Sequence, residues 1–384
     1  MNQKTILILG GYGNTGRYLA DLLLKETNIQ IVVAGRSQDK AQQLATLLNR
    51  SYPGNRVRGL SLDASDTQTL TKALDGIDLM VVASSTTKYA PQLAMAALQA
   101  DVDYLDIQYS IPKITFLKSM AAQIESAGRC FITDGGFHPG LPGYLVRYSA
   151  QYFDHILSAK VGSVIKEDWK HLDVGKSTIY ELVELMNDYE MLIYRAGKWK
   201  KVGFFDMSEY IRMDFGEVFG KQYCAPMMLE EMRTLPEIFP TLTESGFYVG
   251  SFNWFVDWLI MPLSMLAMKM SPQAARKLVG KWMLWGLKTF TRPPFGTLLK
   301  VISSGEKDGR QKSLEITISH SDGYLFTAIP VAACLLQYLD GSFVTKPGLW
   351  WQAHIVEPNR FMRDMQRMGI AIKTSDGGTS EVEP

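Results

Sequence analysis

The first 140 residues alternate short aliphatic runs with longer amphipathic stretches, and this alternation limits the available folds more than any other feature of the chain. Residues 5–9 read Thr-Ile-Leu-Ile-Leu, and further runs of strand length occupy residues 30–34, 57–62, 78–83, 103–105 and 130–133. The first of these runs is continuously aliphatic, as is typical of a parallel strand buried on both faces, and the signals at 103–105 and 130–133 are weaker. Their alternation with helices predicts an α/β fold built on a parallel sheet with right-handed crossovers.

A glycine-rich loop follows the first of these runs. Residues 10–16 read G-G-Y-G-N-T-G, and an amphipathic stretch over 14–25 predicts the next helix. In the pattern Gly11-x-Gly13-x-x-Gly16, the first glycine allows a sharp turn, the second lets a pyrophosphate approach the backbone, and the third lets the helix pack on the strand. Free N–H groups at the helix start then bind phosphate. We expect a Rossmann-type dinucleotide-binding domain over residues 1–150; a purely structural glycine turn is the alternative. The expected cofactor contacts in this loop are Gly11, Tyr12, Gly13, Asn14, Thr15 and Gly16.

The end of the second strand favours NADP over NAD. NAD-binding domains usually place a carboxylate there to bind the ribose 2′-hydroxyl. This chain has Gly35-Arg36-Ser37 and no acid before Asp39. Arg36 can form charge-assisted hydrogen bonds to a 2′-phosphate, with Ser37 as a further donor; a solvated arginine at a helix start is the alternative.

The ends of the next two strands carry further candidate cofactor contacts. Asp63 follows the third strand, and we expect it near the adenine. Ser84 and Ser85 follow the fourth strand, and we expect them near the nicotinamide half. Both expectations rest on the rule that ligands bind beyond the carboxyl ends of parallel strands.

A second glycine-rich motif, D-G-G-F-H-P-G-L-P-G over residues 134–143, follows the strand at 130–133. Together with the first loop it resembles the saccharopine dehydrogenase family. Residues 102–106, V-D-Y-L-D, resemble the segment between the cofactor and substrate domains in that family. The resemblance implies an NADP-dependent oxidoreductase that acts on a small molecule. His138 stands where the family's motif usually has Asp, and histidine does not suit the ammonium group of an amino-acid substrate. We therefore expect a substrate other than saccharopine.

Two side chains are candidates for proton transfer beside the hydride transfer that a nicotinamide supplies. His138 follows the last strand of the nucleotide domain, and its ordinary pKa near 6.5 suits proton exchange. Tyr109 follows the strand at 103–105 and offers a phenolic hydroxyl. Each has a structural alternative: a histidine bonded to the turn, and a tyrosine packed against the cofactor. No HExxH motif, no G-x-S-x-G elbow and no paired Cys/His ligands occur, so no metal is expected.

The sequence pattern of residues 151–345 predicts a second, α+β domain. Residues 155–164 and 313–319 alternate like strands with one buried face, and 177–192 has the pattern of an amphipathic helix. We expect a mostly antiparallel sheet that serves the substrate or a dimer contact. Residues 346–372 are expected to return to the first domain, and 373–384 to form a disordered tail.

A helical insertion at 252–296 is rich in tryptophan and methionine. Leu278, Trp282 and Trp285 share one face of a helix, and Lys277, Lys281 and Lys288 lie on another. Three interpretations follow. In the first, the two helices pack on each other and the lysines lie in solvent. In the second, they form the wall of a pocket for an apolar substrate. In the third, they lie on an anionic membrane.

Composition excludes several classes of function. The formal net charge is +1, so there is no electrostatic basis for nucleic-acid binding. The first apolar run is only a strand's length, and no apolar run reaches the roughly 20 residues of a spanning helix. Three dispersed cysteines fit a reducing compartment, and we expect a cytoplasmic protein. A homodimer and a peripheral membrane contact are compatible with the sequence. A non-catalytic NADP-binding protein at a membrane or on a partner is the alternative to the enzyme.

Overall fold

The computed structural model describes residues 3–171, 189–203, 206–250, 252–270, 272–343 and 346–376, with the side chains of 265 and 268–277 left aside. Contacts between Cα atoms divide the chain into two compact units. The first comprises Met1–Leu141 and Tyr324–Gly369, and the second comprises Pro142–Gly323 and Ile370–Pro384. Each unit therefore contains one long segment from the body of the chain and one short segment from its C-terminal part.

The first unit contains a seven-stranded sheet in the order β15-β6-β5-β4-β1-β2-β3, and all strand pairings among its described residues are parallel. This confirms the predicted Rossmann-type sheet. The strands are β1 (Thr5–Leu9), β2 (Gln30–Gly35), β3 (Val57–Ser61), β4 (Leu79–Val82), β5 (Asp103–Asp106), β6 (Cys130–Thr133) and β15 (Gly348–Trp351).

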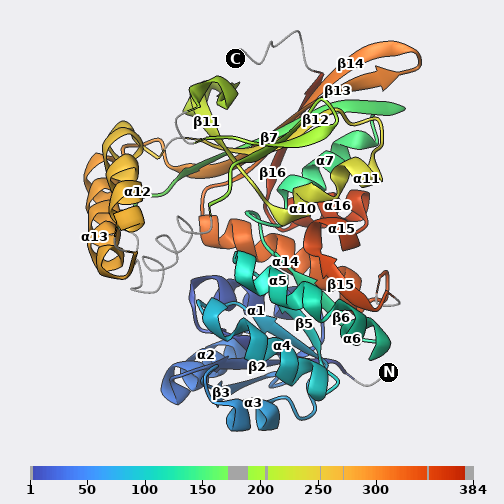
Figure 1. Cartoon of the computed structure of the whole chain (residues 1–384). Helices are drawn as coiled ribbons and strands as arrows, with labels where there is room; N and C mark the ends of the chain where they lie inside the picture. Colours follow the sequence, from blue (N-terminus) through green and yellow to red (C-terminus); the bar gives the residue numbers. More distant parts are fainter. Residues whose placement is uncertain are drawn as a thin grey trace. The chain divides into compact units, whose positions relative to one another are not determined.

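Helices connect these strands, as parallel pairing requires. Figure 1 shows the first of them in blue and cyan around the sheet, and the last in orange and red. They are α1 (Asn14–Glu26), α2 (Gln38–Ser51), α3 (Thr67–Ala73), η1 (Thr87–Tyr89), α4 (Ala90–Gln99), α5 (Ile111–Ser119), α6 (Ala121–Ser126), α14 (Gly323–Leu339), α15 (Gln352–Ile355) and α16 (Pro358–Arg367).

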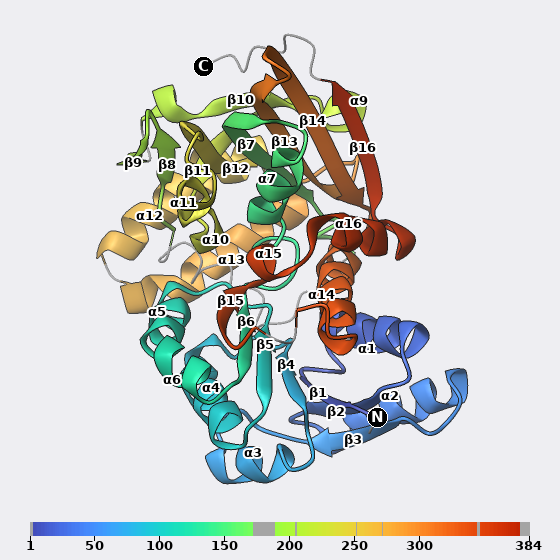
Figure 2. The same ribbon diagram turned by 90° about the vertical axis from the view of Figure 1, so that its right-hand side faces the viewer.

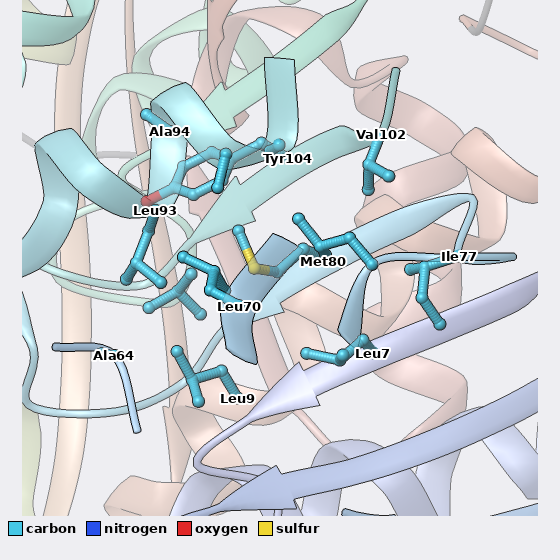
Figure 3. Close-up of a cluster of buried hydrophobic side chains, with 14 of the residues drawn as sticks. Leu7, Leu9, Ala64, Leu70, Ile77, Met80, Leu93, Ala94, Val102 and Tyr104 are labelled. Carbon is cyan, nitrogen blue, oxygen red and sulfur yellow. The ribbon is translucent and has the colours of Figure 1, made fainter. Parts of the chain in front are cut away.

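The aliphatic runs are buried on both faces of the first sheet. Leu7 and Leu9 of β1 face the same side, where they share a core with Met80 of β4 and Tyr104 of β5 (Figure 3). Ile6 and Ile8, which alternate with these leucines along β1, are also fully buried and face the opposite side of the sheet. Burial on both sides explains why these strands read as continuous apolar runs.

The second unit contains a mixed, mostly antiparallel sheet, which confirms the predicted α+β character. The strand order is β10-β11-β12-β7-β13-β14-β16, with β8 paired to β12 and β9 paired to β8. Only the β12–β7 pairing is parallel among those of the described residues. The strands are β7 (His155–Lys166), β8 (Leu192–Arg195), β9 (Lys198–Lys201), β10 (Ile211–Asp214), β11 (Lys221–Met227), β12 (Glu244–Gly250), β13 (Gly296–Lys307), β14 (Arg310–His320) and β16 (Ala371–Asp376).

The helices of the second unit include a pair of long helices between β12 and β13. The pair, α12 and α13, lies side by side in both views (Figures 1 and 2). None of the described helices combines the length and hydropathy that crossing a membrane requires. The helices of this unit are α7 (Pro142–Ala150), η2 (Met207–Glu209), α9 (Gly216–Phe219), α10 (Glu230–Arg233), α11 (Leu235–Ile238), the π-helical segment η3 (Val256–Ile260), α12 (Met261–Met270) and α13 (Pro272–Phe290).

Three segments differ from the sequence-based expectations. Residues 103–106 form β5 inside the first sheet, so the V-D-Y-L-D segment does not join two domains. Residues 371–376 form β16, which pairs antiparallel with β14 at the edge of the second sheet. The expectation was that residues up to 372 return to the first domain and that 373–376 belong to a disordered tail. Strand β15 was not expected at all. Residues 377–384 and most of the helix expected over 177–192 lie outside the described residues.

Candidate functional site

The strand order creates a switch point beside β1. From β1 the chain moves outward through β2 to β3, and it then crosses back to β4 on the other side of β1. The loops that follow β1 and β4 therefore lead away from each other. Ligands of open α/β sheets bind in the crevice at this point. The glycine loop follows β1, so it lies at the place where a dinucleotide is expected.

Two glycines of this loop are required by close packing. A Cβ atom on Gly16 would lie 2.2 Å from the carbonyl oxygen of Gly10, and one on Gly11 would lie 2.8 Å from that of Ile8. Neither position has room for a side chain, because both contacts are with backbone. These glycines bring the start of α1 against the end of β1.

Gly13 differs from its neighbours. It is the N-cap of α1, with φ −73° and ψ 175°, and no side chain caps this helix end. A Cβ atom here would meet only the carbonyl oxygen of Gly10, at 3.0 Å. Asn14 and Thr15, both half-buried, form the first turn of α1, which carries no acidic residue. The positive end of the helix is thus left for an anion.

Tyr12 links the glycine loop to the end of β2. Its ring covers Gly35, where a Cβ atom would lie 2.6 Å from Tyr12 Cε1. The Tyr12 hydroxyl accepts a hydrogen bond of 3.0 Å from the backbone N–H of Ser37. The Ser37 hydroxyl caps α2 by accepting from the N–H of Lys40. The Tyr12 ring and the Ser37 cap thereby fix the backbone on either side of Arg36.

Three charged side chains, Arg36, Asp63 and Lys88, follow the ends of strands β2, β3 and β4. Asp63 accepts two hydrogen bonds from Ser65, from its N–H at 2.9 Å and its hydroxyl at 2.8 Å. These bonds lower the pKa of Asp63, and the positive charges of Arg36 and Lys88 lower it further. Both cations are exposed; Arg36 directly follows β2, and Lys88 lies in η1 after β4. Sequence reasoning missed Lys88, although it lies only four residues beyond Ser84.

The end of β4 is held by a polar cluster. The hydroxyls of Ser84 and Thr86 lie 3.0 Å apart, and Ser84 is half-buried while Ser85 is exposed. The buried side chain of Gln108 donates to the Thr86 hydroxyl at 3.1 Å and to the carbonyl oxygen of Ser84. Gln108, which sequence reasoning missed, thus joins the loops after β4 and β5.

A buried ion cluster lies behind the loops after β5 and β6. The ammonium of Lys113 in α5 contacts Asp106 at 2.6 Å and Asp134 at 2.9 Å, and all three side chains are buried. It also donates to the carbonyl oxygen of Gln108. Burial acts to lower the pKa of Lys113, but the two carboxylates outweigh it and the net shift is upward. Lys113 is therefore charged, and it fixes two strand ends at once.

The segment 134–140 is pinned by a residue far away in sequence. The side-chain amide of Gln352 in α15 accepts from the N–H of Gly136 at 3.1 Å and donates to its carbonyl oxygen at 3.0 Å. The ring of Phe137 stacks on Phe326 of α14, with centroids 4.8 Å apart. No local signal marks Gln352, because its partner lies 216 positions earlier in the chain.

The two candidate proton donors occupy neighbouring loops. Tyr109, half-buried, follows β5, and His138, also half-buried, follows β6. Desolvation lowers the pKa of His138 to about 4. Loss of solvation around the ring thus favours the uncharged imidazole over the proton-exchanging form that its ordinary pKa suggested.

We expect His138 to make the protein less stable in mild acid. In an unfolded chain its pKa is near 6.5, and in the fold it is about 4. Between these values the unfolded chain binds more protons, so the free energy of unfolding should fall by about 1 to 2 kcal/mol from pH 7 to pH 5. Urea unfolding at both pH values measures this loss. His138→Gln should remove it and His155→Gln, at an exposed position, should retain it; equal losses in all three proteins would contradict the assignment.

Comparison with known proteins identifies the N-terminal part of the chain. Residues 6–130 match the saccharopine dehydrogenase NADP binding domain family. The match runs from β1 to the start of β6 and confirms the resemblance seen in the first glycine loop. The second glycine-rich motif, residues 134–143, lies beyond the matched range. It also confirms NADP as the cofactor of this domain.

The saccharopine dehydrogenase fold extends over both units. The apo saccharopine dehydrogenase (L-Glu forming) of Saccharomyces cerevisiae superposes with a TM-score of 0.69 over 98% of this chain and 100% of that chain, at 16% identity. At this identity the likeness concerns the fold.

A curated relative, the shikimate dehydrogenase (NADP(+)) of Halothermothrix orenii, is 29% identical over 118 residues. The matched region is 30% of this chain and 40% of the relative, so the chain spans less than half the length of that protein.

Proposed function

We propose that this protein is an NADP-dependent oxidoreductase that transfers hydride to or from a C=N, C=O or C=C bond of a small, apolar substrate. The observation that carries the proposal is the uncapped start of α1 at the switch point, with Gly13 open and two cations at the neighbouring strand ends. When bound there, NADP supplies the hydride chemistry.

The residues of the first unit fit this cofactor. The N–H groups of Asn14 and Thr15 at the start of α1 would bind the pyrophosphate, which Gly13 admits to the backbone. Arg36 and Lys88 would bind the 2′-phosphate from two loops through charge-assisted hydrogen bonds. The remaining assignments follow the strand ends: Asp63 near the adenine, and Ser84 and Ser85 near the nicotinamide.

Of the two candidate donors, we assign proton transfer to Tyr109. The pKa of about 4 leaves His138 without its second proton at neutral pH. As a neutral imidazole, His138 would orient the substrate by hydrogen bonding. The Tyr109 hydroxyl carries a proton that it can donate. Because His138 is uncharged and stands in place of a carboxylate, the site also favours a substrate without an ammonium group.

A cytoplasmic location is part of the same proposal. The three cysteines, Cys130, Cys224 and Cys334, are free and buried, a state that a reducing compartment maintains.

Calorimetric titration with NADPH and NADH tests the cofactor assignment. Arg36→Asp should weaken NADPH about 10- to 100-fold, the scale of about 1 to 3 kcal/mol for hydrogen bonds to charged groups, and should spare NADH. Arg50→Asp makes the same charge change at the other end of α2 and should leave both affinities unchanged. Equal losses of NADPH and NADH in Arg36→Asp would mean that Arg36 does not contact the 2′-phosphate. Absence of binding by both cofactors to the wild-type protein would overturn the proposed function.

A further inference from the structure

The pair of helices between β12 and β13 exposes an unusual number of large apolar side chains. Trp254 and Trp258 are each 65% exposed, and Trp285 is 54% exposed. Four of the chain's eight tryptophans lie in residues 252–296, and these three are the exposed ones among them. Further large apolar side chains exposed here are Leu259, Leu263, Leu266 and Leu278. Exposed apolar patches of this kind mark interaction surfaces.

The exposed aromatic rings form one continuous surface. Trp254 and Trp285 come from different helices, yet both pack edge-on against Phe290, with centroids 5.9 and 5.6 Å away. Phe255 stacks on the same Phe290 at 4.1 Å. Trp258 follows Trp254 by four residues, about one helical turn. The surface therefore spans both helices.

A small core of its own holds this surface in place. Val256 and Ile260 of η3 pack with Val279, Met283 and Leu287 of α13, and all five are buried. Gly286 brings the helices close, because a Cβ atom there would lie 2.7 Å from Ile260 Cδ1. The apolar side chains on the outer face are thus additional to those that hold the pair together. The two helices pack on each other, as the first of the three interpretations has it. Of the three side chains placed on one face from the sequence, Leu278 and Trp285 are exposed, and Trp282 is half-buried against this core.

Positive charge is concentrated on the same helices. On the exposed face of α13, Lys281 and Lys288 alternate with Leu278 and Trp285 at helical spacing. Residues 252–296 contain a single acid, Asp257, and six basic residues, and so carry a net charge of +5 in a chain whose total is +1. The basic residues are Lys269, Arg276, Lys277, Lys281, Lys288 and Arg292.

We propose that this surface docks on an anionic lipid bilayer. Tryptophan is suited to the boundary between headgroups and acyl chains, where its ring is buried and its N–H stays hydrated. Lysines next to the rings extend their ammonium groups to acidic headgroups. Since none of the described helices can cross a membrane, the pair lies along the interface. A second copy of the chain is disfavoured as the occupant, because the face would bring like charges together. The proposal stands independently of the proposed oxidoreductase activity.

Vesicle sedimentation with the full chain tests the proposal. Wild-type protein should bind vesicles of phosphatidylcholine mixed with phosphatidylserine and bind pure phosphatidylcholine about ten-fold or more weakly. Lys281→Glu combined with Lys288→Glu should reduce binding to the anionic vesicles by about ten-fold or more, since each cation near such a surface contributes about a factor of five. Trp258→Ser combined with Trp285→Ser should reduce it similarly, and lipids brominated on the acyl chains should quench wild-type tryptophan fluorescence.

The controls change equally exposed residues elsewhere in the second unit. Lys198→Glu with Lys201→Glu reverses two exposed charges on β9, and Tyr223→Ser removes an exposed ring on β11. Both should bind vesicles like the wild type. Absence of binding to anionic vesicles, or equal losses in the control variants, would overturn the proposal. So would light scattering that shows a wild-type dimer which Trp258→Ser with Trp285→Ser converts to a monomer, because the face would then be covered by a second copy.

Discussion

Gly13→Val is expected to abolish measurable NADPH binding and to leave the fold intact. The backbone of Gly13 is extended, with φ −73° and ψ 175°, which any residue adopts. A Cβ atom here would lie 3.0 Å from the carbonyl oxygen of Gly10, a tight contact that a shift of a few tenths of an ångström relieves, so we expect at most a small loss of stability. A valine side chain would instead fill the space through which the pyrophosphate approaches the start of α1. We expect the affinity for NADPH to fall at least about 100-fold, or roughly 3 kcal/mol.

Two further variants separate cofactor exclusion from misfolding. Gly13→Ala should weaken NADPH less than Gly13→Val, because a methyl group blocks less of the approach. Gly16→Val should destabilise the protein itself, because its Cβ atom would lie 2.2 Å from backbone. Calorimetric titration and thermal unfolding of the three variants measure both properties. NADPH binding of wild-type strength by a folded Gly13→Val protein would place the pyrophosphate elsewhere.

Lys113→Met should cost about 3 to 5 kcal/mol of stability, the usual effect of removing one partner from a buried ion pair. The substitution retains most of the volume of the side chain but leaves Asp106 and Asp134 buried without their cation. For a unit of this size, such a loss lowers the melting temperature by roughly 10 °C.

The same helix offers a matched control. Lys118 is exposed on α5, and Lys118→Met should change stability by less than about 1 kcal/mol, as is usual on a surface. Adding Asp106→Asn and Asp134→Asn to Lys113→Met should restore part of the lost stability, because no charge then remains buried without a partner. A Lys113→Met protein as stable as the Lys118→Met protein would show that the cluster does not hold the strand ends.

The first sheet could be predicted from the sequence because its signals are local. Strands β1, β2, β4 and β6 are short runs rich in apolar residues, and the Gly11–Gly16 loop predicts both the turn and the helix after β1. The predicted 5–9 and 130–133 strands coincide with β1 and β6. Strand β15, G-L-W-W, is also apolar but was not predicted. It has only four residues, and the strand it pairs with, β6, ends more than 200 positions earlier.

Only the candidate site residues that lie at the ends of strands could be predicted from the sequence. Arg36 and Asp63 could be found because each directly follows a strand. Lys113 could not, since a lysine inside a helix reads as solvated until the fold brings Asp106 and Asp134 to it. The pKa of His138 depends on the loss of solvation around its ring in the fold, and no pattern around residue 138 encodes that environment.

The discontinuous make-up of the two units has a consequence for synthesis on the ribosome. The first unit needs β15 and α14, and the second needs β16, so neither is complete until the C-terminal part of the chain has emerged. At about 5 to 20 residues per second, residue 369 follows residue 130 by roughly 10 to 50 s. During that interval Cys130 and Phe131 of β6 form an unpaired edge of the nascent sheet. The N-terminal segment can thus be recognised from its sequence as an NADP-binding domain, but it lacks the strand and helix that complete its fold. A chain truncated after β6 would expose that edge permanently.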